Sequence, residues 1–144
     1  MLYVATALAS RDPELEERVR RHRERRPAGW GTLELGGEDL GAVFEAAKGW
    51  EAVLLDSITL WISARMLAGE EGEMTLQELH RFLEGAMVLA TPLILVSDEV
   101  GLGVVPESDA GRAFRDVLGL ANQRAAAAAA EVRLCVAGIG MRIK

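Results

Sequence analysis

Short apolar runs alternate with segments of helical character along most of this chain. Four runs have the length and residue types of buried β-strands: Leu2–Thr6, Ala52–Asp56, Leu93–Ser97 and Val132–Ala137. A less apolar run at Trp30–Leu35 is a further candidate strand. Because the runs are apolar at successive positions, we expect strands buried on both faces. The alternation predicts an α/β fold with a mostly parallel sheet flanked by helices.

Helix signals occupy the segments between these runs. Asp12-Pro13 would cap a helix that reaches about Arg26, and Ser108 would cap a long helix near the C-terminus. Thr75 and Glu78 have the spacing of a capping box, which predicts an exposed loop before Thr75. The remaining expected elements are short helices at Asp39–Lys48 and Ile58–Leu67, and a last strand at Met141–Lys144. We therefore expect one domain over residues 1–144.

Composition excludes several classes of protein. Half of the 144 residues are hydrophobic and 26% are charged, which argues against disorder. The single cysteine, Cys135, rules out a disulfide framework, and its apolar neighbours predict a buried thiol. No apolar stretch is long enough to span a bilayer, and no secretory signal opens the chain. The expected location is the cytoplasm.

A basic island stands out in an otherwise acidic chain. The net charge is −6, yet Arg18–Arg26 holds six Arg and one Glu, a local charge of +5. Duplex DNA favours broad positive surfaces, and single-strand binders interleave aromatic residues, so we expect no nucleic-acid partner. An island of this size suits the phosphate groups of a small ligand. The alternative is a solvated helix face with Arg–Glu pairs.

Polar residues follow three of the expected strands. Thr6, Asp56 and the pair Asp98-Glu99 come where parallel strands would end together, the edge at which α/β sheets bind ligands. Asp56 follows four apolar residues, an arrangement that presents a carboxylate to Mg²⁺ in nucleotide-binding sheets. Its alternative role is to cap the next helix. Glu99 could orient a water or support a metal ligand, or be an ordinary loop charge.

His22 lies inside the basic island. Its spacing from Leu15 and Val19 predicts a core-facing position, where a histidine is more often structural. The flanking arginines favour a second reading, because a neutral imidazole beside neutralised phosphates is a competent nucleophile towards phosphorus. Glu34 could accept hydrogen bonds from a nucleotide base, or be an exposed strand residue. The other histidine, His80, is expected to pack or lie on the surface.

Five motifs occur in one order along the chain and together resemble a known family. They are H-x-x-x-R-P-x-x-W at His22–Trp30, LLDSITLW at Leu54–Trp61, VSDEVGLGVVPE at Val96–Glu107, ANQRAAAAAAEV from Ala121, and the closing GIGMRIK. The resemblance is to the bifunctional adenosylcobinamide kinase/adenosylcobinamide-phosphate guanylyltransferase family of cobalamin biosynthesis. It covers essentially the whole chain and implies a P-loop NTPase (RecA-like) fold.

The resemblance implies two reactions and their residues. A nucleoside triphosphate, GTP or ATP, phosphorylates adenosylcobinamide, and GTP then guanylylates a histidine that passes GMP to the cobinamide phosphate. The matching nucleophile is His22. Mg²⁺ is implied at Asp56, and a homo-oligomer is implied as the assembly. The implied nucleotide contacts are Thr6, Ala7, Leu8, Arg23, Glu24, Arg25, Arg26, Glu34 and Asp56.

One family motif is missing from these 144 residues. The family begins with a strand and a P-loop, G-x-x-x-x-G-K-[ST], ahead of the strand that matches Leu2–Thr6, and no such motif occurs here. The expected domain is thus N-terminally incomplete by a β-loop-α unit of about 30 residues. Either the chain is a shortened form of an ordinary enzyme, or it is a homologue that lost the loop and became a silent nucleotide- or cobinamide-binding partner subunit. The retained His22, Asp56 and arginines favour the first.

Overall fold

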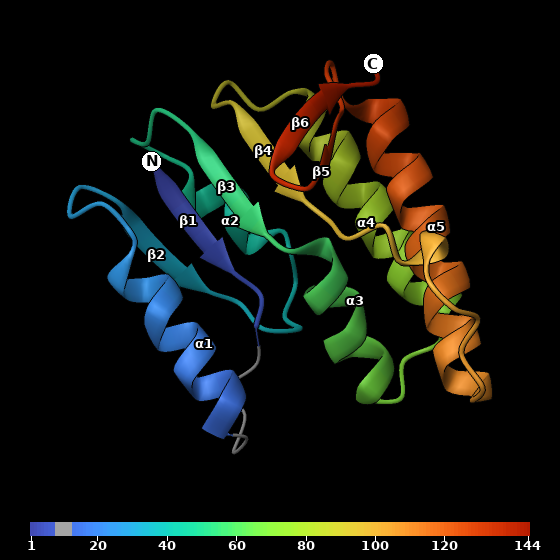
Figure 1. Cartoon of the computed structure of the whole chain (residues 1–144). Coiled ribbons are helices and arrows are strands. Elements are labelled where there is room, and N and C mark those ends of the chain that lie inside the picture. Colours follow the sequence, from blue (N-terminus) through green and yellow to red (C-terminus); the bar gives the residue numbers. More distant parts are fainter. Residues whose placement is uncertain (8–12) are drawn as a thin grey trace.

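A computed structural model describes residues 1–7 and 13–144 of the chain. Strands and helices alternate along most of it (Figure 1). The elements are β1 (Leu2–Ala5), α1 (Pro13–Glu24), β2 (Gly31–Glu34), α2 (Ala42–Ala46), β3 (Val53–Asp56), α3 (Ile58–Leu67), α4 (Gly72–Met87), β4 (Leu93–Val96), the 3₁₀ turn η1 (Val100–Leu102), α5 (Asp109–Ala128), β5 (Arg133–Val136) and β6 (Ile139–Arg142). The α/β prediction is confirmed.

The first four strands form a parallel sheet in the order β2-β1-β3-β4. The register aligns their carboxyl ends: Ala5 lies opposite both Glu34 and Asp56, and Asp56 lies opposite Val96. This register places the polar residues at the carboxyl ends of these strands along one edge of the sheet, as predicted. The cap expected at Asp12 lies outside the described residues.

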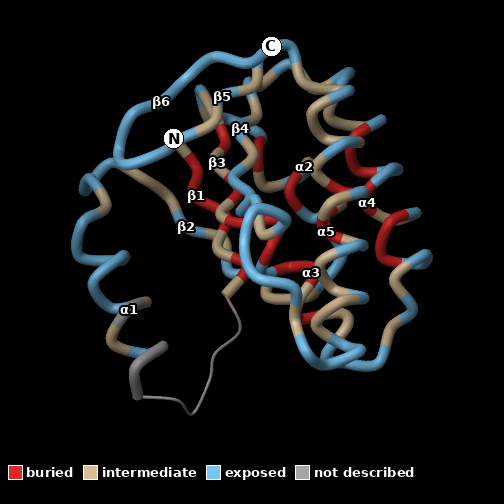
Figure 2. Tube along the Cα trace, turned by 45° about the vertical axis from the view of Figure 1, so that its right-hand side comes forward, coloured by how far each residue is buried: buried red, intermediate tan, exposed pale blue. Residues whose placement is uncertain are grey.

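One face of this sheet carries the hydrophobic core. Alternate strand residues such as Val4 and Leu55 are fully buried in one cluster with buried residues of α2, α3, α4 and α5 (Figure 2). Trp61 is among the largest of the buried side chains. The opposite face is more open, because Ile94 and Val96 of β4 are 48% and 37% exposed. The expectation of strands buried on both faces is therefore wrong for β4, whose outer edge pairs with no other strand of the described chain.

The C-terminal strands differ from the prediction in the same way. Among the strands that the structure describes, β5 pairs with β6 alone, antiparallel, in a two-stranded sheet separate from the main one. Ile139 is 68% exposed, and Cys135 is also exposed. The predicted pairing of the last two strands is confirmed, but the predicted burial of Cys135 is wrong, because most residues of both strands are exposed.

Helix starts agree with the prediction in two cases and not in a third. Ser57 caps α3 and Ser108 caps α5, each through a backbone N–H that its hydroxyl accepts. Thr75 does not cap α4, because that helix already begins at Gly72. The capping box is therefore wrong: Thr75 lies buried within the helix, and Glu78 pairs with Arg65 instead.

Two side chains of α3 hold the loop that connects β2 to α2. Trp61 is fully buried and its indole Nε1 donates to the Glu38 carbonyl at 2.8 Å. Arg65 Nη1 donates to the Gly37 carbonyl at 3.1 Å, and its guanidinium also pairs with Glu70 and Glu78. Burial raises the pKa of Glu78 despite that ion pair.

Among the described helices, none is long and apolar enough to cross a membrane.

Candidate functional site

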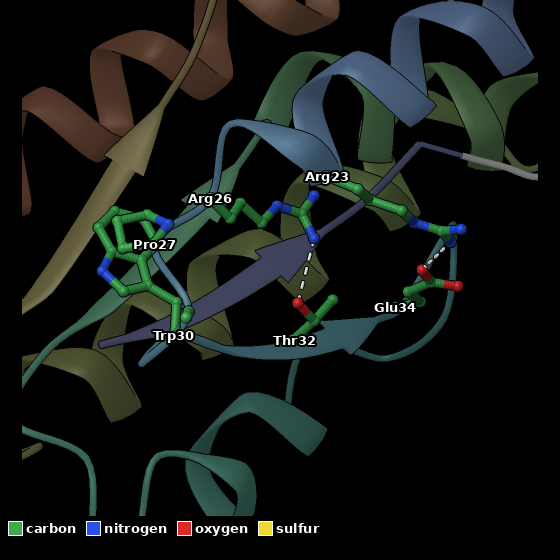
Figure 3. A pocket seen from close by; sticks show the side chains of 7 residues that line it. Arg23, Arg26, Pro27, Trp30, Thr32 and Glu34 are labelled. Carbon is green, nitrogen blue, oxygen red and sulfur yellow. Dashed lines mark hydrogen bonds and ion pairs between the residues drawn. The ribbon is translucent and has the colours of Figure 1, made fainter.

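A pocket of about 350 Å³ lies between the end of α1 and β2. Arg23 of α1 and Arg26, just after the helix, line one side of the pocket. Thr32 and Glu34 of β2 line the other side (Figure 3). The other lining residues are Pro27, Ala28 and Trp30. The local sequence explains the shape, because α1 ends at Glu24 and Pro27 cannot continue a helix, so the chain turns and enters β2.

The basic island divides between two roles. Arg20 and Arg21 pair with Glu17, and Arg20 also pairs with Glu24, as expected for a solvated helix face. Arg23 and Arg26 instead line the pocket. The solvated-face interpretation is therefore confirmed for Arg20 and Arg21, and phosphate binding by Arg23 and Arg26 stays a prediction.

Polar contacts fix both ends of the pocket. At one end the Arg23 guanidinium pairs with the Glu34 carboxylate, and both side chains are more than half exposed (Figure 3). At the other, Arg26 Nη1 donates to Thr32 Oγ1 at 3.1 Å. The guanidinium carbon of Arg26 lies 3.7 Å from the centroid of the Tyr3 ring, which is a cation–π contact. The pocket thus presents two cations beside one carboxylate.

Tyr3 joins this pocket to the end of β3. Its hydroxyl donates to Asp56 Oδ2 at 2.5 Å. Burial, and then the hydrogen bond to Asp56, raise the pKa of Tyr3 to about 12, so the phenol is a stable donor. Sequence reasoning missed Tyr3 because it lies within a strand that reads as apolar; the available signal was its position two residues before Ala5, on the same face of the strand.

Asp56 does not cap the next helix, because Ser57 does. Its Oδ1 accepts no hydrogen bond from the described residues, so among these it could serve a ligand. No group of three or more His, Cys, Asp or Glu suited to a metal ion occurs among the described residues. A cation such as Mg²⁺ often takes one or two protein carboxylates and completes its shell with phosphate oxygens and water. Asp56 fits that kind of site.

His22 is exposed in the last turn of α1, between Arg21 and Arg23. The predicted core-facing position is wrong, because His22 is exposed, as are Arg21 and Arg23 on either side of it. Exposure is what a nucleophile needs to meet a substrate. His22 does not itself line the pocket, but its neighbour Arg23 does.

The remaining predicted site residues that the structure describes do not line this pocket. Thr6 is fully buried and its hydroxyl bonds the backbone of Ser57, so it joins β1 to the start of α3. Ala7 is half-buried beside it, whereas Leu8 lies outside the described residues. Arg25 is exposed and does not line the pocket.

The turn after β4 is held by hydrogen bonds that sequence reasoning did not anticipate. Thr59 Oγ1 accepts from the Asp98 backbone N–H at 2.7 Å, and Asn122 Nδ2 donates to the Asp98 carbonyl at 3.0 Å. Ser97 Oγ donates to Asn122 Oδ1 at 2.6 Å. Glu99 accepts from the Gly101 N–H at 3.0 Å, so it stabilises its own loop. His80 is exposed on α4, near Glu84.

Comparisons with known proteins agree with the motifs. The family model described as cobinamide kinase / cobinamide phosphate guanyltransferase matches residues 1–143. The chain is 34% identical to the bifunctional adenosylcobalamin biosynthesis protein CobU of Salmonella typhimurium, over all of this chain and 86% of that relative. It is 33% identical to the CobU of Escherichia coli, with the same coverage. It is 36% identical to the bifunctional adenosylcobalamin biosynthesis protein CobP of Pseudomonas aeruginosa, over 99% of this chain and 81% of that relative. This chain belongs to the cobinamide kinase / cobinamide phosphate guanyltransferase family.

Proposed function

We propose that the chain transfers GMP from GTP to adenosylcobinamide phosphate through His22, and takes part in phosphorylating adenosylcobinamide. The observation that carries the proposal is an exposed histidine adjoining a pocket lined by Arg23, Arg26 and Glu34. Family membership supports the reaction type, and the exposed imidazole supports the nucleophile.

The proposed reaction has two steps. A lone pair of the His22 imidazole attacks the α-phosphorus of GTP, a P–N bond forms, and the bond to the β-phosphate oxygen breaks to release pyrophosphate. An oxygen of the cobinamide phosphate then attacks the same phosphorus, the P–N bond breaks, and adenosyl-GDP-cobinamide forms. A covalent intermediate divides one difficult transfer into two easier ones.

The residues around the pocket supply charge and recognition. Arg23 and Arg26 neutralise phosphate oxygens as negative charge shifts to the leaving group. Mg²⁺, when bound at Asp56, supplies further neutralisation of phosphate charge. Glu34 accepts from the N1–H and the amino group of guanine, which distinguishes GTP from ATP because adenine carries an acceptor at N1. We keep Ala7, Leu8, Glu24 and Arg25 as nucleotide contacts, with the Thr6 side chain fixing the end of β1.

Phosphoryl transfer makes a further demand that these residues do not meet alone. Kinases hold the β- and γ-phosphates with backbone amides and a lysine, and residues 1–144 contain no G-x-x-x-x-G-K-[ST] motif. We therefore propose that a P-loop unit acts together with this chain. The open outer edge of β4 supports this, because it offers unpaired backbone groups to another strand.

The apolar side chains exposed on β4 and on the β5–β6 hairpin favour a homo-oligomer. We place the chain in the cytoplasm, where GTP, ATP and Mg²⁺ are available.

The test of function is transfer. The chain, fused to a P-loop segment and incubated with α-labelled GTP and Mg²⁺, is expected to take up an acid-labile, base-stable label. Adding adenosylcobinamide phosphate should then release the label as product. A fusion that binds GTP and cobinamide in calorimetry but takes up no label would support the silent binding subunit instead.

A further inference from the structure

Tyr3 makes two contacts through opposite parts of one side chain. The face of its ring lies under the Arg26 guanidinium, and its hydroxyl donates to Asp56. The residue itself is only 7% exposed, in the middle of β1. Because Tyr3 is buried in a strand, its neighbours hold the side chain in place. The Arg26 guanidinium and the Asp56 carboxylate, which it contacts, are therefore held at one distance from each other.

The strand register explains how one side chain reaches both groups. Tyr3 lies opposite Thr32 on β2, and Thr32 accepts the hydrogen bond from Arg26. The guanidinium therefore rests on a cross-strand pair that supports it from two strands. On the other side, Asp56 lies diagonally from Tyr3, opposite Ala5. The small side chain of Ala5 leaves the path from the Tyr3 hydroxyl to Asp56 open.

The Arg26 guanidinium donates only one hydrogen bond to the residues that the structure describes. Its Nη1 bonds Thr32, while its Nε is buried and meets no acceptor among the described residues. A guanidinium has five N–H donors and suits bidentate binding of phosphate. The face of the Tyr3 ring thus supports Arg26 through a contact with the guanidinium carbon.

We propose that Tyr3 is a positioning residue that sets the Arg26 guanidinium and the Asp56 carboxylate at a fixed spacing for one nucleotide. The ring orients Arg26, and the hydroxyl orients Asp56 by occupying Oδ2 and leaving Oδ1 free. This inference rests on the proposed function, because it assigns both partners to the nucleotide. It adds that the phosphate-binding cation and the carboxylate are mechanically coupled through β1.

The two halves of the proposal are separable by substitution. Tyr3→Phe keeps the ring under Arg26 and removes only the hydroxyl. Tyr3→Leu keeps an apolar strand residue and removes both contacts. A role in packing alone would predict that both contacts respond together to either substitution.

Nuclear magnetic resonance of the ligand-free chain tests the geometry without any activity. The readouts are the Nε–H signal of Arg26, assigned with Arg26→Lys, and the carboxyl carbon signal of Asp56, assigned with Asp56→Asn. We expect Tyr3→Phe to shift the Asp56 signal and leave that of Arg26 in place, and Tyr3→Leu to shift both. An Arg26 signal that does not move in Tyr3→Leu, or an Asp56 signal that does not move in Tyr3→Phe, would overturn the proposal.

Labelling of His22 by GTP tests the consequence. Tyr3→Leu should raise the GTP concentration for half-maximal labelling about tenfold, the effect of losing about 1.4 kcal/mol of binding. Tyr3→Phe should leave that concentration within about twofold and slow labelling at saturating GTP. Equal effects of the two variants would contradict the division of roles. If both signals shift as expected but the P-loop fusion of the parent chain binds GTP and takes up no label, then the coupling stands and the proposed function fails. If Arg26→Ala labels like the parent, the assignment of Arg26 to the nucleotide is overturned while transfer through His22 stands.

Discussion

The Tyr3 hydroxyl of β1 donates to Asp56 Oδ2 of β3 across 2.5 Å. This contact ties the centre of one strand to the carboxyl end of its neighbour, where the ligand edge of the sheet lies. It also gives the chain a direct spectroscopic reporter, because Tyr3 is the only tyrosine in the sequence.

The first prediction concerns alkaline pH. Burial and the Asp56 carboxylate raise the Tyr3 pKa from 10.0 to about 12. Because the folded pKa exceeds the unfolded one, this stabilisation is complete below pH 10 and is lost as the pH rises towards 12. The phenolate absorbance should therefore begin to increase only at a pH well above that at which free tyrosine ionises, or at the pH at which the chain unfolds.

Asp56→Asn provides the control for that titration. It removes the negative charge but leaves the burial, so the Tyr3 pKa should fall part of the way and remain above its ordinary value. A phenol that ionises near pH 10 in the folded parent chain would contradict the buried hydrogen bond.

The second prediction concerns Trp61 and the loop after β2. Trp61→Phe removes the indole N–H that the Glu38 carbonyl accepts and leaves a gap in the core. We expect the free energy of unfolding to fall by about 2 kcal/mol, measured by urea titration. Leu67→Ala, at an exposed position of the same helix, should change it by less than about 0.5 kcal/mol. Equal losses in the two variants would contradict this packing.

The third prediction concerns the ion pairs of Arg65. Arg65→Met leaves Glu70 and Glu78 without their shared cation in a half-buried position, and should cost about 3 kcal/mol of stability. Arg81→Met is the matched control, since Arg81 is exposed on α4 and forms no ion pair with the described residues. A parallel loss in both variants, measured by thermal unfolding, would argue against a specific role of Arg65.

The fourth prediction concerns the choice of nucleotide. Glu34→Gln keeps the size of the side chain but removes the charge that receives the guanine N–H groups. GTP affinity should fall about tenfold while ATP affinity stays unchanged, measured by equilibrium dialysis on the P-loop fusion. Glu45→Gln on α2, whose one ion pair among the described residues is with Lys48, should leave both affinities unchanged. An equal loss for GTP and ATP would assign Glu34 to general charge balance with Arg23.

Much of the fold was predictable, because it depends on local patterns. The apolar runs indicated four of the six strands well, and Ser57-Ile58 begins α3 at the residue that the pattern predicted. The misplaced features depend on tertiary contacts. Thr75 has the local signature of a cap, but Arg65 from another helix recruits Glu78, and the helix starts a turn earlier.

The site shows the same division. Asp56, Arg26 and Glu34 were identified from strand ends and motifs, whereas the burial of Cys135 and His22 was predicted wrongly. Helical spacing of apolar residues predicts which side of a helix faces the core only when the whole helix packs on the core. The end of α1 does not pack there, because residues 20–25 are exposed. Tyr3 could not be singled out, because its role depends on a diagonal contact between strands that are 53 residues apart.

His22 is the residue that we propose to carry GMP, and the site of covalent labelling tests this proposal. The chain has only two histidines, so His22→Asn and His80→Asn form a matched pair. With the P-loop fusion, α-labelled GTP and Mg²⁺, we expect the label on the peptide that contains His22, its loss in His22→Asn, and full labelling in His80→Asn. Label that survives His22→Asn, or no label in a folded fusion that binds GTP, would contradict the account.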